Sequence, residues 1–213
     1  MNDNTNKIVE WTLDDVSGDV QRISLVTAPA IESDFMLFNS TEQNFKATDN
    51  DKRILTGVAM RPNINIARRD EDGELYYGFF SDETVEKAQQ LFFKSGQNTN
   101  NTNLEHEFIV DDIFVFESWI VEDEKVDKSI VLGLTDIRKG DWVVSMKVDN
   151  DVVWDEFLKT GQIKGFSVEI KAQENEVDCT QETFNYIYDL LDSTKDEDEI
   201  YDLIYAKISE YGE

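Results

Sequence analysis

Positively charged residues are scarce in this chain, and their scarcity excludes whole classes of partner. Among its 213 residues, 46 Asp and Glu outnumber 20 Lys and Arg, which gives a net charge of −26. Nucleic acids and anionic membranes are bound through clustered Lys and Arg, so we expect neither as a partner. The negative charge either keeps the protein soluble or recruits a basic partner.

Cysteine, histidine and long apolar runs are also scarce. Cys179 is the only cysteine, so no intrachain disulfide can form, and a reducing compartment is favoured. One His and one Cys cannot build a zinc site, and no glycine-rich phosphate loop follows a strand, so neither a metal nor a cofactor is expected. The N-terminus lacks signal-peptide character, and no run reaches the roughly 18 apolar residues of a membrane helix. These features predict a cytoplasmic-type protein.

What the chain does contain is a series of short strand-like runs. With only 2 prolines and 10 glycines, it has no long linker composition. Asp72-Gly73 is a hairpin turn signal. Amphipathic helices are predicted over residues 81–96 and 150–161. The strand-like runs are residues 22–27, 53–60, 63–67, 74–80, 106–110, 113–121, 129–134, 141–148 and 163–170. Many short strands with peripheral helices predict an α+β, mainly β fold built on a closed or nearly closed barrel.

The composition changes after the last strand-like run. Residues 172–213 carry 13 acids and 2 lysines, a net charge of 2 − 13 = −11. Two amphipathic helices are readable there, over 180–191 and 196–211, and their apolar faces could dock on the barrel or on another protein. We therefore predict a barrel domain over residues 1–171 and an acidic helical segment over 172–213.

A serine and a histidine are the candidates for chemistry. In the strand "GFSVEI", alternation places Gly165, Ser167 and Glu169 on one face, and a glycine there would let a substrate strand approach closely. His106, in "NLEHEF", is the only histidine and follows the polar loop "QNTNNTN". A serine hydrolase that uses Ser167 needs a base, and His106 is the only histidine available. Taken alone, such a serine is more often a solvent-facing residue of an amphipathic strand, and a single histidine is more often a surface or capping residue than a catalyst.

The order of several motifs carries a resemblance to a known family. "LVTAPAIESDF", "NIARRDEDGELYYGFFSDETV", "NLEHEF", "FESWIVEDEKVDKS", "GDWVVSMKV", "VWDEFLKTG" and "KGFSVEI" follow one another over roughly residues 20 to 171. In this order they resemble the phage serine protease family called XkdF. That family looks like a branch of the phage prohead proteases, which are similar to herpesvirus assemblin. The resemblance implies an assemblin-like barrel with peripheral helices and a C-terminal helical pair.

The resemblance also implies roles for individual residues. The histidine of "HE" is the base and the serine of "GFS" is the nucleophile, which assigns these roles to His106 and Ser167. Assemblin-type enzymes use a second histidine, which this chain lacks, so an acid must complete a triad. Glu169 shares the face of Ser167 and ranks ahead of its rival Glu117. Strict alternation from His106 puts Glu117 on the opposite face, unless the residues between them form a bulge.

The function implied is that of a serine endopeptidase acting in phage head maturation. Its substrates would be scaffold and major capsid proteins, and its location the host cytoplasm, inside the assembling prohead. A homo-oligomer is compatible with this function. The alternative is a non-catalytic capsid-assembly or scaffold protein that retains the protease fold. A small acidic interaction module is a third interpretation, from outside phage biology.

Overall fold

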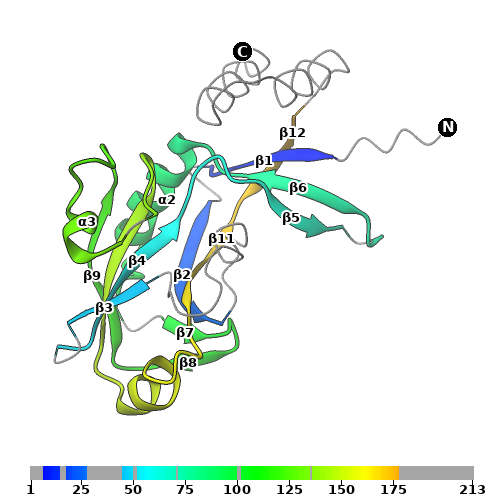
Figure 1. Cartoon of the computed structure of the whole chain (residues 1–213). Coiled ribbons are helices and arrows are strands. Elements are labelled where there is room, and N and C mark those ends of the chain that lie inside the picture. The colour runs from blue at the N-terminus through cyan, green and yellow to red at the C-terminus, as the bar shows by residue number, and fades with distance from the viewer. Residues whose placement is uncertain are drawn as a thin grey trace, which may run out of the picture.

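The computed structural model (Figure 1) describes most of the chain up to Val177. All structural statements below concern the described residues, which are 7–14, 18–27, 45–49, 52–70, 72–99, 102–134 and 136–177. Of strand 45–49 only the backbone is described. The predicted helices over 180–191 and 196–211, and Cys179, lie outside these residues.

The described strands form three four-stranded sheets. The first has the order β12-β1-β6-β5, from β12 (Gln173–Glu176), β1 (Ile8–Thr12), β6 (Leu75–Phe79) and β5 (Ile66–Arg69). The second has the order β11-β2-β7-β8, from β11 (Gly165–Lys171), β2 (Asp19–Val26), β7 (Thr102–Leu104) and β8 (Phe108–Val110). The third has the order β3-β4-β10-β9, from β3 (Phe45–Asp49), β4 (Ile54–Met60), β10 (Trp142–Val148) and β9 (Ile113–Ile120).

Three helices lie outside the sheets in the described part of the chain. Helix α2 (Asp82–Lys94) follows Ser81 and ends before Gly96, whose φ of 74° is left-handed, in agreement with the predicted helix over 81–96. The predicted helix over 150–161 is confirmed in position, although residues Val153–Leu158 wind as a π-helix, η1. The third helix is α3 (Lys128–Leu132).

Helix α3 corrects the sequence-based prediction of a strand over 129–134. Asp127 caps the helix by accepting a hydrogen bond from the backbone N–H of Ser129 at 2.8 Å. Gly133 ends it in the left-handed region, with a φ of 91°. These two caps favour a helix, and they outweigh the β-propensity of the apolar run between them. Hydrophobic alternation alone does not reveal such caps.

The closed barrel expected from the sequence is not found among the described strands. Strand β11 packs against β4 of the neighbouring sheet, but no hydrogen-bonded ladder joins the two. The sheets therefore remain open, and β11 is an edge strand of its own sheet. The fold is mainly β with a few helices, as predicted.

The main core lies between the sheets and helix α2. Alternate residues of the strands point into it, and α2 adds its apolar face; the largest fully buried side chains include Ile23, Leu55, Phe92, Trp142 and Phe166. Strand β12 pairs with β1, so the folded part of the chain extends past residue 171, where the domain boundary is predicted. The boundary itself stays a prediction. No described helix has the length and apolarity to cross a membrane.

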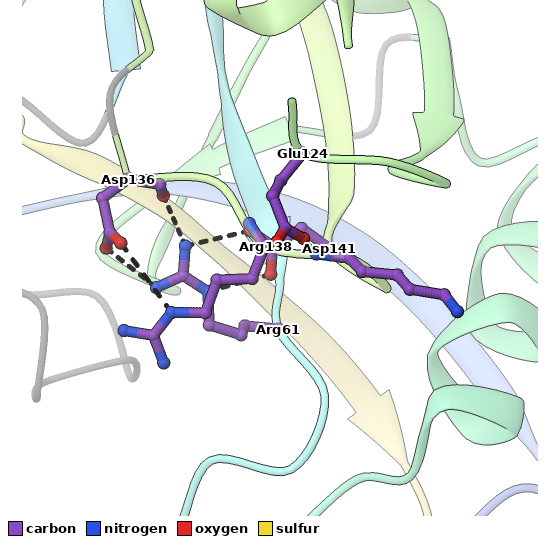
Figure 2. Close-up of polar contacts among 6 residues, drawn as sticks. Arg61, Glu124, Asp136, Arg138 and Asp141 are labelled. Carbon is purple, nitrogen blue, oxygen red and sulfur yellow. Dashed lines mark hydrogen bonds and ion pairs between the residues drawn. The ribbon is translucent and has the colours of Figure 1, made fainter. Parts of the chain in front are cut away.

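A buried arginine ties the end of β4 to the start of β10 (Figure 2). The side chain of Arg61 donates from Nε to Oδ1 of Asp141 at 2.8 Å and from Nη2 to Oδ2 at 2.9 Å. Its Nη1 also donates to Oδ2 of Asp136 at 3.0 Å. Asp141 is fully buried, and burial raises the pKa of its carboxyl while the contact with Arg61 opposes that rise.

Candidate active site

Strand β11 places Ser167 and Glu169 on one face of an edge strand. Its antiparallel pairing with β2 sets Ser167 opposite Ser24 and Glu169 opposite Arg22. Side chains directly opposite on antiparallel strands have Cβ atoms about 5 Å apart, so these four side chains form one polar strip. The pairing shifts register just after Glu169, which is typical of a bulge that turns the strand and re-aims its side chains.

The β7–β8 hairpin carries His106 at its tip. Strand β7 runs parallel to β2, with Leu104 opposite Leu25, and the backbone N–H of Glu105 donates to the carbonyl of Leu25 at 3.1 Å. In the turn that follows, Glu105 and His106 have φ values of 53° and 62°. Such left-handed conformations cost about 1 kcal/mol or more for a non-glycine residue, so their presence favours a functional reason.

The histidine and the glutamate are in direct contact. Nδ1 of His106 lies 2.9 Å from Oε1 of Glu169. The hydroxyl of Ser24 lies 3.1 Å from the same Nδ1 and donates to Oε1 of Glu169 at 3.1 Å. The amide of Asn103 donates to Oε1 at 2.7 Å, and Nε of Arg22 lies 3.0 Å from Oε2 in an ion pair. One carboxylate thus gathers side chains from two strands, β2 and β7, and from the turn after β7.

Glu169 is held in its ionised form. Partial burial raises the pKa of its carboxyl, but the hydrogen bonds from Asn103, His106 and Ser24, together with the charge of Arg22, outweigh that effect. The net pKa lies below the ordinary value of 4.5. A carboxylate only accepts hydrogen bonds, so Nδ1 of His106 must carry the proton in this contact. In the neutral ring, the other nitrogen, Nε2, is then the acceptor.

Ser167 lies beside this cluster without a direct bond to the imidazole. Among the described residues, no hydrogen bond joins Ser167 to His106, and the hydrogen bonds of the imidazole go to Ser24 and Glu169. Ser167 is 8% exposed, whereas Ser24 is 0% exposed. Ser167 and Glu169 also line a cavity of about 420 Å³ between β11 and the end of β4. Ser24 is not among the residues that line this cavity.

The rival carboxylate, Glu117, lies in a different sheet. It is on β9, accepts a hydrogen bond from Ser145 at 3.2 Å and pairs with Lys128 at 2.6 Å. The chain bends between β8 and β9, with a φ of 61° at Asp112, so alternation from His106 does not continue to Glu117. The structure thus brings Glu169, and not Glu117, to His106. Gly165 lies at the start of β11, opposite Val26.

Sequence reasoning missed Ser24, Asn103 and Arg22. A usable signal was present for two of them, because Arg22 and Ser24 alternate with apolar residues in the strand "RISLV" and therefore share a face. What the sequence lacked was the pairing of β2 with β11, which is a contact between residues 145 positions apart. Asn103 was assigned to a polar loop, although residues 102–104 form strand β7.

Comparison with known proteins gives one family. The model described as "Putative phage serine protease XkdF" matches residues 42–176. This range contains His106, Asn103, Ser167 and Glu169, whereas strand β2 with Arg22 and Ser24 lies before it. Searches among curated proteins and among solved structures gave no match.

Proposed function

Because this chain belongs to the phage serine protease family XkdF, we propose that it is a serine endopeptidase with Ser167 as nucleophile, His106 as general base and Glu169 as the third member. The observation that carries the proposal is the contact of 2.9 Å between Nδ1 of His106 and Glu169, on the strand that bears Ser167. In serine hydrolases, an acid at one ring nitrogen leaves the other free to serve the nucleophile.

The chemistry follows from these roles. Ser167 Oγ attacks the peptide carbonyl while Nε2 of His106 takes its proton, and the imidazolium then protonates the leaving amine. Water, activated by the same nitrogen, hydrolyses the acyl-enzyme and restores the serine. Glu169 remains ionised throughout and stabilises the imidazolium. Ser167 and His106 must approach when substrate is bound, as catalytic hydrogen bonds often tighten only in the complex.

We assign the role of nucleophile to Ser167 in preference to Ser24. Ser24 is fully buried, and its hydroxyl already donates to Glu169. It also lies against Nδ1, the nitrogen that contacts the acid, and a base acts from its opposite nitrogen. Ser167 instead lines the cavity beside β11.

The biological substrates in this proposal are scaffold and major capsid proteins, cleaved inside the assembling prohead. The matching family is described as a phage serine protease, and the sequence resemblance to prohead proteases is what suggests these substrates. A non-catalytic capsid-assembly protein is the second candidate, because Ser167 and His106 share no hydrogen bond in the described part of the chain.

Labelling with a fluorophosphonate separates these possibilities. Such a probe forms a covalent bond only with a serine that a base activates. We expect one adduct per chain, located on Ser167 by mass spectrometry, and none after denaturation. An adduct on Ser24 would move the nucleophile to β2. A folded protein that takes no label would favour the non-catalytic candidate.

The side of β11 that faces away from β2, where the described strands form no ladder, is the proposed place for substrate. An extended peptide can add to an exposed sheet edge through main-chain hydrogen bonds, and β11 ends its sheet. Gly165 leaves the reactive face without a side chain two residues before Ser167.

We therefore expect Gly165→Val to block peptide entry while leaving the fold largely intact, because valine suits strands. Cleavage should fall about tenfold or more through a raised KM, while the fluorophosphonate, which needs no strand addition, still labels Ser167. Unchanged KM in a well-folded Gly165→Val protein would rule this geometry out. Thermal unfolding of the variant is the control for the fold.

A further inference from the structure

The oxygen Oε1 of Glu169 receives more hydrogen bonds than the contact with His106 requires. Asn103 Nδ2 donates to it at 2.7 Å and Ser24 Oγ at 3.1 Å, beside His106 Nδ1 at 2.9 Å. The other oxygen, Oε2, lies 3.0 Å from Nε of Arg22. Three donors on one oxygen hold the carboxylate more firmly than the contact with His106 alone would.

This arrangement anchors an imidazole that has little other support. The side chain of His106 is 43% exposed and stands at the tip of a three-residue turn. Its two hydrogen-bond partners, Glu169 and Ser24, both lie on one side of the ring, at Nδ1. The orientation and the tautomer of the ring therefore depend on how firmly these two partners are held.

The hydrogen bond from Asn103 to Glu169 leaves the other polar atom of the Asn103 amide unsatisfied. The residue is 1% exposed, and its buried Oδ1 has no hydrogen-bond partner among the described residues. Burying a polar atom without a hydrogen bond is unfavourable, because the atom loses its contact with water. Turning the amide over would place Oδ1 against the carboxylate and remove the donor, so the amide keeps this orientation despite the cost.

Ser24 contacts both His106 and Glu169. Its only hydrogen goes to Glu169, so its oxygen is oriented to accept, and the Nδ1–H of His106 can be shared between Oε1 and Ser24 Oγ. Both acceptors favour a proton on Nδ1. When the hydroxyl hydrogen of Ser24 is donated to Glu169, neither the hydroxyl nor the carboxylate can donate to Nδ1. The tautomer with its proton on Nε2 is then not stabilised by either group.

We propose that Ser24 and Asn103 are positioning residues that clamp the Glu169 carboxylate and thereby lock His106 in the tautomer with the proton on Nδ1. Without them, Glu169 is freer to rotate away and the ring exchanges with the tautomer that carries its proton on Nε2. That second form cannot accept a proton from a serine at Nε2. This inference deepens the proposed function, but the state of the ring can be measured without any substrate.

The chain offers a direct measurement, because His106 is its only histidine. In protein labelled with ¹⁵N-histidine, NMR at a pH where the ring is neutral gives one pair of ring-nitrogen signals, and their shifts report which nitrogen carries the proton. We expect Nδ1–H to dominate in the wild-type protein. Ser24→Ala and Asn103→Leu should each lower the ratio of Nδ1–H to Nε2–H by about tenfold, since a hydrogen bond to a charged group contributes ~1.5 kcal/mol.

Ser145→Ala is the matched control. Ser145 is 2% exposed and donates to the carboxylate of Glu117 at 3.2 Å, so the same substitution removes the same kind of bond in another sheet. It should leave the tautomer ratio unchanged. Ser24→Thr keeps the hydroxyl and should retain most of the wild-type ratio. If Ser24→Ala does not fold, Asn103→Leu and Ser24→Thr still test the clamp.

The outcomes separate this inference from the proposed function. Wild-type protein with the proton on Nε2, or clamp variants with an unchanged ratio, would overturn the inference even if the protein is an active protease. A locked Nδ1–H tautomer in a protein that takes no fluorophosphonate would support the clamp and reject the protease. In an active enzyme, the clamp variants should lower kcat and leave KM nearly unchanged, because neither residue lines the cavity beside Ser167.

Discussion

Replacing Ser167 with alanine is expected to lower peptide-bond hydrolysis by about 10⁴-fold or more, to the level left by binding alone. His106→Ala should cost about as much, since a serine hydroxyl is a poor nucleophile until a base takes its proton. The double variant should lose little beyond either single one, because the two side chains act as a unit. The measurement is the rate of processing of a co-expressed capsid or scaffold protein and of a short peptide.

The two carboxylates provide an internal comparison for this result. Glu169→Gln removes the negative charge beside Nδ1 of His106 and can present an amide N–H there, which favours the wrong tautomer, so it should lower kcat by about 10²-fold to 10⁴-fold. Glu117→Gln, in the other sheet, should leave kcat nearly unchanged. Equal activity in both variants would indicate a dyad, and full activity in Ser167→Ala would end the protease interpretation.

The second large effect concerns stability. Arg61→Met keeps most of the apolar stem of the side chain but leaves the fully buried Asp141 without its bidentate partner. Breaking a buried ion pair by removing one member costs about 3–5 kcal/mol. We therefore expect the free energy of unfolding, measured in urea, to fall by that amount at neutral pH. Arg53→Met is the control, because its partner Asp151 is exposed, and it should cost less than about 1 kcal/mol.

The pH dependence of the Arg61→Met variant follows from Asp141. Burial already raises the pKa of this carboxyl, and loss of the arginine removes the interactions that oppose the rise. The folded variant then binds a proton that the unfolded chain releases near pH 3.8, so its stability falls as pH increases above that value. The deficit relative to wild type should be larger at pH 8 than at pH 5. A deficit independent of pH would show that lost packing, not the unpaired carboxylate, is the cause.

Local signals predicted the elements that have strong local determinants. The hairpin at Asp72-Gly73 forms, with Gly73 at a φ of 84°, and helix α2 begins and ends at its predicted residues. The run over 129–134 was misassigned because its helix depends on the Asp127 cap, a side-chain contact that hydrophobic alternation does not encode. Short strands such as β7 and β12 were missed because they are polar. The partner of β12, strand β1, also lies far away in the sequence.

The candidate site was also predicted only in part, because alternation within a strand can be read from the sequence and pairing between distant strands cannot. Alternation within one strand placed Glu169 on the face of Ser167, and this holds in the structure. The choice between Glu169 and Glu117 required knowing that β9 belongs to another sheet, which is a matter of topology. Ser24 could not be ranked from the sequence, because its importance comes from lying opposite Ser167 and beneath a hairpin tip.

One continuous stretch of backbone, from β11 through Ala172 to β12, belongs to two sheets. The pairing of β12 with β1, where Trp11 lies opposite Glu174, therefore constrains the same stretch that pairs with β2. A slip of one residue would exchange the faces of a strand, so that Phe166 and Val168 would replace Ser167 and Glu169 on the polar strip. The pairing of β12 with β1 therefore helps to fix the register of β11. A fold in which all these strands are paired keeps Ser167 and Glu169 on the polar strip.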